Sequence, residues 1–132
     1  MIEEGTPIFV QIAEQIEDDI IDGVYPAETQ VPSTNEFAAF HRINPATAGK
    51  GVGLLVDEGI LYKKRGIGMF VTEGARERLI AKRRQAFPHE YLRPLLAEAA
   101  KLGIDTEQLS RMIRTAAQTE AADASPTKGV SA

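Results

Sequence analysis

The chain has 132 residues, of which 43% are apolar, and a formal net charge of −4, a size that fits one compact domain with a short appendage. No apolar run approaches the roughly 18 to 20 residues that cross a bilayer. The N terminus lacks the pattern of a secretion signal, and the sequence holds no cysteine for a disulfide or a soft-metal site. We therefore expect a cytoplasmic protein with no membrane contact.

The charge is unevenly distributed along the chain. Residues 1–73 have a net charge of −7, and residues 74–132 have a net charge of +3. The overall charge opposes contact with DNA, but only charges within about a Debye length, roughly 8 to 10 Å, act on a bound phosphate. All five bases of the first segment lie between Arg42 and Arg65, whereas seven of its twelve acids lie in the first 22 residues. The distribution therefore permits DNA binding without proving it.

Three helices are expected in the first half of the chain. The first spans about residues 7–22, because its apolar residues recur at steps of three and four and Gly23 supplies a stop. The second begins at Ser33, where the serine and Glu36 fit a capping box. The third begins at Asn44, since asparagine caps a helix well and the following proline is tolerated in the first turn. The short break between the last two helices predicts a helix-turn-helix.

The third helix is expected to have an apolar inner side and a small, polar outer side. The inner side is formed by Ala48, Val52, Leu55 and Val56. Three glycines in this helix each lower its stability by about 0.8 to 1 kcal/mol relative to alanine. We therefore expect a packing or functional role that explains their presence. Two explanations stay open: Gly49 and Gly53 let the backbone approach a DNA groove closely, or Gly51 packs tightly within a soft helix.

A β-hairpin is predicted after the third helix, because two short β-prone runs flank the glycine-bearing turn at residues 66–68. Three consecutive cations stand at its tip: Lys63, Lys64 and Arg65. We interpret the hairpin as a wing that contacts phosphate or a groove. The alternative is that these charges only prevent edge-to-edge aggregation of the strands. Because strand residues alternate between faces, only one of the two lysines is expected to face DNA.

Further helices are expected from about residue 73 onwards. Pro88 and Pro94 interrupt the first of them, so we expect a bend or a restart near Pro88. Gly103 is a helix stop, and Asp105 can cap a last helix. Residues beyond 117 lack periodic apolar positions and are predicted to be disordered. The basic stretch over residues 76–84 is either a solvated face or a second phosphate contact.

The C-terminal helices carry more apolar surface than one chain can bury, which predicts a two-fold homodimer. The expected interface consists of Leu79, Ile80, Phe87, Tyr91, Leu95, Leu102, Leu109, Met112 and Ile113. The predicted fold is mainly α with a small β-hairpin. It comprises a winged helix-turn-helix in residues 1–73, a helical dimerisation arm in residues 74–117 and a disordered tail in residues 118–132.

No arrangement of residues indicates catalysis or metal binding. His41 and His89 are far apart in the sequence, and neither has other ligand types at metal-binding spacing. No serine lies in a glycine-flanked elbow, and the glycines at the hairpin turn are too few for a phosphate-binding loop. We therefore expect no enzyme, no cofactor and no metal.

Four segments resemble GntR-type regulators: Val31–Ser33, Asn44–Thr47, Asp57–Leu61 and Arg65–Val71. Residues 90–96 and 102–104 resemble the YtrA subfamily, whose members lack a large effector domain and often control transporter operons. The resemblance implies DNA contacts at Ser33, Thr34, Asn35, Asn44, Ala46, Thr47, Lys50, Arg65 and Gly66. The sequence departs from the family at Asn35, where arginine is usual, and at Gly49, where a larger or basic residue is frequent.

The function predicted from these observations is sequence-specific binding of a palindromic DNA operator by a homodimeric transcription regulator, most simply a repressor. The alternative is a winged-helix module for protein–protein contact without direct DNA binding, which the negative charge of residues 1–73 would suit. The sequence leaves open whether a small-molecule effector exists; any such site is expected in the crevice of the dimer, with Phe87, Tyr91 and Arg93 as candidate contacts.

Overall fold

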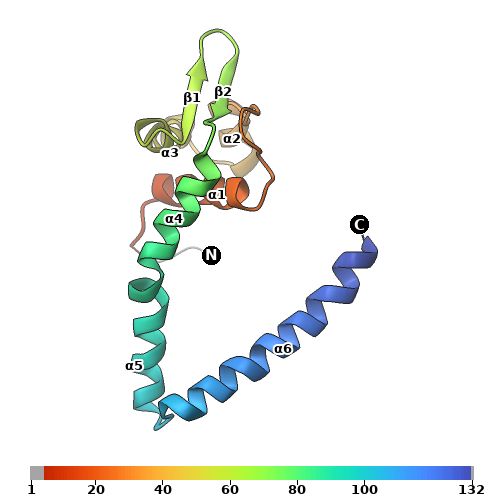
Figure 1. Cartoon of the computed structure of the whole chain (residues 1–132). Helices are drawn as coiled ribbons and strands as arrows, with labels where there is room; N and C mark the ends of the chain where they lie inside the picture. Colours follow the sequence, from red (N-terminus) through yellow and green to blue (C-terminus); the bar gives the residue numbers. More distant parts are fainter. Residues whose placement is uncertain (1–4, 132) are drawn as a thin grey trace. The chain divides into compact units, whose positions relative to one another are not determined.

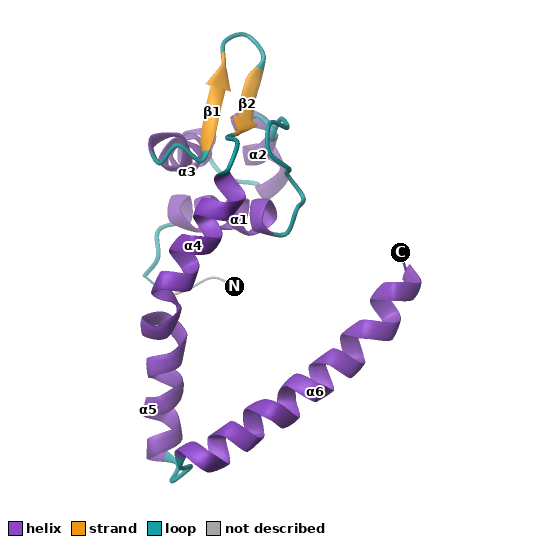
Figure 2. Ribbon diagram, in the orientation of Figure 1, coloured by secondary structure: helices purple, strands orange, loops and turns teal. Residues whose placement is uncertain are grey.

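The computed structural model describes the backbone of residues 5–131 and the side chains of residues 5–123. Its elements (Figures 1 and 2) are, in chain order, α1 (Ile8–Ile21), α2 (Thr34–His41), α3 (Pro45–Asp57), β1 (Leu61–Lys64), β2 (Gly68–Val71), α4 (Ala75–Phe87), the π-helical turn η1 (Pro88–Leu92), α5 (Arg93–Lys101) and α6 (Thr106–Ser131). The chain divides into two compact units, Met1–Gln85 and Ala86–Ala132. None of the described helices combines the length and the apolarity needed to span a membrane.

The predicted fold class is confirmed, and the helix starts follow the predicted chemistry. The Oγ of Ser33 accepts a hydrogen bond from the Glu36 N–H at 3.0 Å, while the Glu36 carboxylate accepts one from the Ser33 N–H at 2.9 Å. At the start of α3, the Oδ1 of Asn44 accepts from the Ala46 N–H at 2.7 Å. These bonds satisfy N–H groups that a helix N terminus otherwise leaves without partners.

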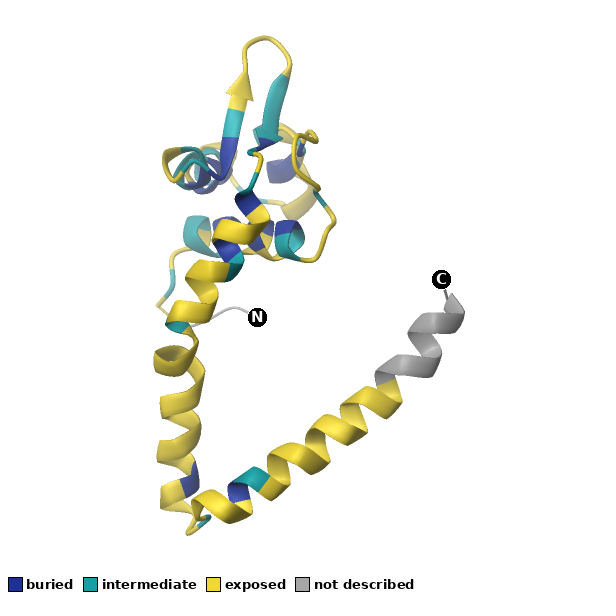
Figure 3. Cartoon of the chain, viewed as in Figure 1, coloured by how far each residue is buried: buried dark blue, intermediate teal, exposed yellow. Residues whose placement is uncertain are grey.

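A single apolar core holds the first unit together (Figure 3). Its buried members are Ile12, Ala13, Ile16, Ile20, Val31, Phe37, Val52, Leu55, Ile60, Leu61, Val71, Ala75 and Leu79. β1 and β2 pair antiparallel, with Leu61 opposite Val71 and Lys64 opposite Gly68. Only the base of the hairpin therefore lies in the core, and its tip extends into solvent.

The helices α1 and α3 approach each other closely at Gly51. A Cβ at this position would lie 2.7 Å from the carbonyl oxygen of Phe9 and 3.1 Å from side-chain atoms of Ile12. A Cβ at Gly49 would make ordinary contact with Thr34, at 3.5 Å, and one at Gly53 would meet nothing within 4 Å. Tight packing thus explains the glycine at position 51, but it does not explain the other two.

The first unit extends past the boundary expected at residue 73, because the beginning of α4 belongs to its core. Ala75 and Leu79 are completely buried there. The structure corrects the expectation that Leu79 lies at a dimer interface. Its side chain packs inside its own unit and is therefore unavailable to a partner.

Arginines near the start of α4 attach it to α1 and α3. The guanidinium of Arg78 donates to the carbonyl oxygens of Glu58 (2.7 Å) and Gly59 (3.1 Å). These two residues follow the last residue of α3, where a cation is favoured by the helix dipole. Arg76 donates in the same way to the carbonyl oxygen of Ile21 at the end of α1, at 2.7 Å.

An ion-pair cluster binds the next turn of α4 to α1. Arg83 lies 2.6 Å from the carboxylate of Asp18 and 3.4 Å from that of Glu17, and Lys82 lies 3.5 Å from Glu17. Partial burial lowers the pKa of Arg83, but the bonds to Asp18 and Glu17 outweigh this effect and leave the pKa raised. The basic stretch is therefore largely engaged in contacts within the first unit.

The second unit begins near the predicted interruption at Pro88. The N–H of Arg93 bonds to the carbonyl of Pro88, five residues earlier, as in a π-helical turn. Gly103 has a φ of +72°, and the carboxylate of Asp105 caps the last helix by accepting from the Gln108 N–H at 2.8 Å. The helix α6 continues to Ser131, whereas a disordered tail was expected from residue 118.

Alanine substitutions at Gly51 and Gly53 should change stability in opposite directions. Gly53→Ala should raise the free energy of unfolding by about 0.8 to 1 kcal/mol, because the methyl group meets no neighbour and alanine favours the helix. Gly51→Ala should lower it by about 1 to 2 kcal/mol, because the methyl group would displace the backbone of α1. Urea denaturation followed by circular dichroism measures both values. Equal destabilisation by the two variants would contradict this packing explanation.

Candidate nucleic-acid interface

The helix α3 presents the small, polar outer side that the sequence predicted. Ala48, Val52 and Leu55 are buried on its inner side. Ala46 and Lys50 are exposed on the outer side, and Thr47 is half-buried. A helix with short outer side chains can bring its backbone close to base edges in a DNA major groove.

The N terminus of α2 forms a second part of the candidate interface. Ser33 and Asn35 are exposed, and Thr34 is half-buried next to Gly49. The N–H groups and the dipole at the start of a helix favour an anion such as a DNA phosphate. The capping box uses a lone pair of the Ser33 oxygen, which leaves the hydroxyl hydrogen for donation to a phosphate.

The turn between α2 and α3 fixes how the two helices follow each other. Arg42 has a left-handed backbone with a φ of +57°, and the N–H of Ile43 bonds to the carbonyl of Ala38 at 3.0 Å. The exposed Asn44 comes next, with its side-chain oxygen engaged in capping α3. Its amide NH₂ is therefore the part of the side chain that can donate to DNA.

The two lysines of the hairpin lie on opposite faces, as predicted. The ammonium of Lys64 lies 4.3 Å from the ring centroid of Phe70, on the outer face of the hairpin. Lys63 is paired with Met69, which packs against the core. Arg65 is exposed at the tip, and Gly66 has a φ of +77°, a backbone conformation that favours glycine.

Both the strands and the turn of the hairpin are tied to the segment that precedes α2. Gln30 forms a β-bridge with Phe70, and its side-chain amide donates to the carbonyl of Ile67 at 3.0 Å. The hydroxyl of Tyr62 donates to the carboxylate of Glu28, and this hydrogen bond is the main reason that the pKa of Tyr62 is raised. These contacts orient the wing relative to the start of α2.

Charge is favourable around the recognition elements despite the acidic total. Residues 42–65 contain five bases and two acids, and one of the acids, Glu58, is paired with Lys82 at 3.5 Å. Lys50 lies with its ammonium 4.6 Å from the ring centroid of Phe9. Sequence reasoning missed this last contact, because no regular spacing connects residues of two different helices.

Comparisons with known proteins agree with this geometry. The model of the gntR family of bacterial regulatory proteins matches residues 9–71. The HTH-type transcriptional repressor YtrA of Bacillus subtilis (strain 168) is 30% identical over 110 residues, which cover 83% of this chain and 84% of YtrA. The chain belongs to the gntR family. It is a transcription regulator, and this membership supports the expectation that it is not an enzyme.

Solved structures extend the similarity to most of this GntR regulator. A GntR family transcriptional regulator from Listeria monocytogenes has a TM-score of 0.71 at 26% identity, covering 86% of this chain and 98% of that chain. The DNA-binding domain of AraR in complex with operator ORR3 has a TM-score of 0.51 at 30% identity, covering 55% of this chain and 87% of that chain. The second similarity concerns a structure that contains DNA.

All predicted DNA contacts of the GntR regulator, from Ser33 to Gly66, lie within the matched residues 9–71. The two departures from the family pattern also lie there. Asn35 is exposed and uncharged, and Gly49 has room for a Cβ. Packing therefore does not require glycine at position 49.

Arg65→Ala should weaken DNA binding without affecting the fold. Losing one phosphate contact should reduce the magnitude of the slope of log K against log salt by about 0.9. The free energy of unfolding should change by less than about 0.5 kcal/mol, because the side chain is exposed. Fluorescence anisotropy over a salt series, with DNA selected by the wild-type protein from a random pool, measures the slope. Lys101→Ala, an exposed cation in α5, is the matched control, and an unchanged slope for Arg65→Ala would exclude this contact.

Proposed function

We propose that this GntR regulator is a repressor that binds a palindromic DNA operator as a homodimer in the cytoplasm. The observation that carries the proposal is the exposed, small-faced α3 followed directly by a hairpin with Arg65 exposed at its tip. Similarity to an AraR domain in complex with an operator supports the proposed binding of DNA. Similarity to YtrA, which is named a repressor, supports the proposed repression.

Each element has a distinct role in the proposed complex. Ser33, Thr34 and Asn35 at the start of α2 hold a phosphate and thereby set the register on the duplex. The helix α3 enters the major groove, where the Thr47 methyl group suits a thymine methyl and Lys50 suits the acceptors of guanine. Arg65 follows the backbone or the minor groove next to this site.

The dimer is proposed from the apolar surface of the second unit. Large apolar side chains between 41% and 64% exposed are Phe87, Tyr91, Leu92, Leu95, Leu96, Leu102, Met112 and Ile113. So much exposed apolar surface on so small a unit indicates a partner, and a second copy supplies a matching surface. Leu109 and Ala99 are already buried within the single chain, and Ile80 is half-buried. We therefore place η1, α5 and the exposed face of α6 in the dimerisation region.

A small-molecule effector remains part of the proposal, with Phe87, Tyr91 and Arg93 as its candidate contacts. The rings of Phe87 and Tyr91 lie 5.5 Å apart, and the guanidinium of Arg93 lies 3.4 Å from the His89 ring. Aromatic rings suit the apolar part of a ligand, and a guanidinium suits an anionic group. A ligand there would act by changing the separation of the two α3 helices.

Selection of DNA from a random pool by the purified protein tests the proposed function. The selected sequences should contain an inverted repeat, and a gel shift with them should weaken steeply between a low and a high salt concentration. A protein–protein module would select no motif and shift no DNA at either salt concentration. That result would overturn the proposal.

Leu95→Asp should convert the dimer into a monomer, because the new carboxylate would be buried against a second copy. The apparent Kd for the selected operator should rise by about tenfold or more. Val24→Asp places the same charge on an exposed apolar residue of the first unit and should leave the dimer intact. Sedimentation velocity measures the oligomeric state, and a dimer of Leu95→Asp as stable as the wild-type dimer would place the interface elsewhere.

A further inference from the structure

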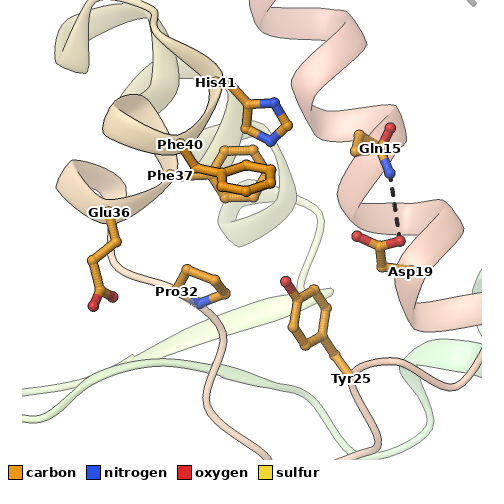
Figure 4. A pocket seen from close by; sticks show the side chains of 8 residues that line it. All are labelled: Gln15, Asp19, Tyr25, Pro32, Glu36, Phe37, Phe40 and His41. Atoms are coloured by element: carbon orange, nitrogen blue, oxygen red, sulfur yellow. Dashed lines mark hydrogen bonds between the residues drawn. The ribbon is translucent and has the colours of Figure 1, made fainter.

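A groove of about 410 Å³ lies on the first unit, and none of the predicted DNA contacts lines it. It is bordered by α1, by α2 and by the segment that joins them (Figure 4), and Pro32 and Glu36 of its lining flank the predicted DNA contacts Ser33, Thr34 and Asn35. The residues that line it are Gln15, Asp19, Tyr25, Pro32, Glu36, Phe37, Phe40 and His41. Neither the DNA interface nor the proposed dimerisation region accounts for this groove.

Aromatic rings form one wall of the groove. The ring of His41 stacks on Phe37, with centroids 4.5 Å apart, and meets Phe40 edge-on at 5.0 Å. Figure 4 shows these three rings together on α2, with Tyr25 on another side of the groove. Phe40 is 82% exposed, so most of its apolar surface remains available to a ligand.

The charged side chains of the groove are carboxylates. Asp19 and Glu36 line it, and no lysine or arginine does. Among the described residues no cation pairs with Asp19, whose carboxylate accepts only a long hydrogen bond, 3.4 Å, from Gln15. Burial raises the pKa of the Tyr25 hydroxyl, and the negative charge of Asp19 raises it further. The groove thus combines aromatic faces with a carboxylate, Asp19, that no described lysine or arginine neutralises.

We propose that this groove binds a small organic cation that carries an apolar group. Asp19 is the counter-ion, and Phe40, His41 and Tyr25 supply the aromatic surface. Ring faces attract a cation through their quadrupole, and a nearby carboxylate adds Coulombic attraction in a partly dehydrated site. An anion is repelled by both carboxylates, and a neutral apolar molecule gains only the hydrophobic contacts.

Occupancy of the groove also affects the start of α2. Glu36 lines the groove and at the same time accepts the hydrogen bond from the Ser33 N–H. A cation beside Glu36 competes for this carboxylate and loosens the cap that orders Ser33, Thr34 and Asn35. Ligand binding and DNA binding then oppose each other. This coupling rests on the proposed function, whereas binding of the cation does not.

Titration of the ¹⁵N-labelled full chain with benzyltrimethylammonium tests the site directly by NMR. The amide signals of Gln15, Asp19, Phe40 and His41 should shift together and saturate. Benzyl alcohol, a neutral aromatic compound, should bind more weakly, and benzoate should produce no saturable shift. Equal affinity for the cation and the alcohol would overturn the proposal. Amide signals of the groove residues that do not shift when the cation is added would also overturn it. Groove signals that shift with protein concentration alone would show a second copy in the groove and would also overturn it.

Two variants locate the binding energy within the groove. Phe40→Ala and Asp19→Asn should each raise the Kd for benzyltrimethylammonium by about two- to fivefold. Phe40 is exposed, and the half-buried Asp19 makes no ion pair among the described residues, so the fold should be retained. The matched controls are Ile67→Ala, an exposed apolar side chain of the first unit, and Asp22→Asn, an exposed acid next to α1; neither residue lines the groove. Equal Kd values for the groove variants and the controls would exclude this site.

The coupling is measured separately. A saturating concentration of benzyltrimethylammonium should raise the Kd of the wild-type protein for its selected DNA, and this effect should be weaker with Asp19→Asn. A chloride salt of tetramethylammonium at equal ionic strength controls for screening, because it lacks the apolar group. If the cation binds but the Kd for DNA is unchanged, the proposed binding site stands and the proposed coupling is overturned. If the NMR shifts saturate but the protein binds no DNA, the proposed function is overturned and the proposed binding site stands.

Discussion

The close contact between α1 and α3 at Gly51 determines the position of the recognition helix. The backbone of α1 occupies the space where a side chain would otherwise stand, because the Phe9 carbonyl is 2.7 Å from the place of a Cβ. The next residue back, Lys50, extends over the ring of the same Phe9. A single turn of α1 therefore sets both the depth of α3 in the core and the position of a cation on its outer side.

The recognition helix is also held at its two ends. Asn44 caps the N terminus of α3, and Arg78 of α4 binds the carbonyls of Glu58 and Gly59 just beyond its C terminus. The ion pairs of Arg83 with Asp18 and Glu17 fix the same part of α4 to α1. The first turns of α4 are thus joined by direct contacts to both α1 and α3.

Features that depend on neighbouring residues could be predicted from the sequence. The capping box at Ser33, the proline after Asn44 and the alternation of Lys63 and Lys64 are local patterns with one favoured geometry. Features that depend on contacts between distant residues could not be predicted from the sequence. Nothing in the spacing around Leu79 shows that it completes the core of the first unit.

The basic stretch in α4 and the groove beside α2 illustrate the same limit. Arg76, Arg78 and Arg83 had the composition of a phosphate-binding or solvated face, yet their partners are carbonyls and carboxylates 19 to 66 positions away in the sequence. The sequence predicted a helix that begins at Ser33 but gave no indication that the ring of Phe40 within it would be 82% exposed. Contacts between residues that are distant in the sequence determine both the role of these arginines and the exposure of Phe40.

The hairpin separates residues that maintain the fold from residues that can vary. Its buried pair, Leu61 and Val71, lies at the base, whereas the positions from Lys63 to Ile67 are exposed. Substitutions at the tip can therefore alter affinity for DNA at little risk to folding. Over evolutionary time, the wing can therefore accumulate changes that tune the strength of DNA binding, while the same core is inherited unchanged.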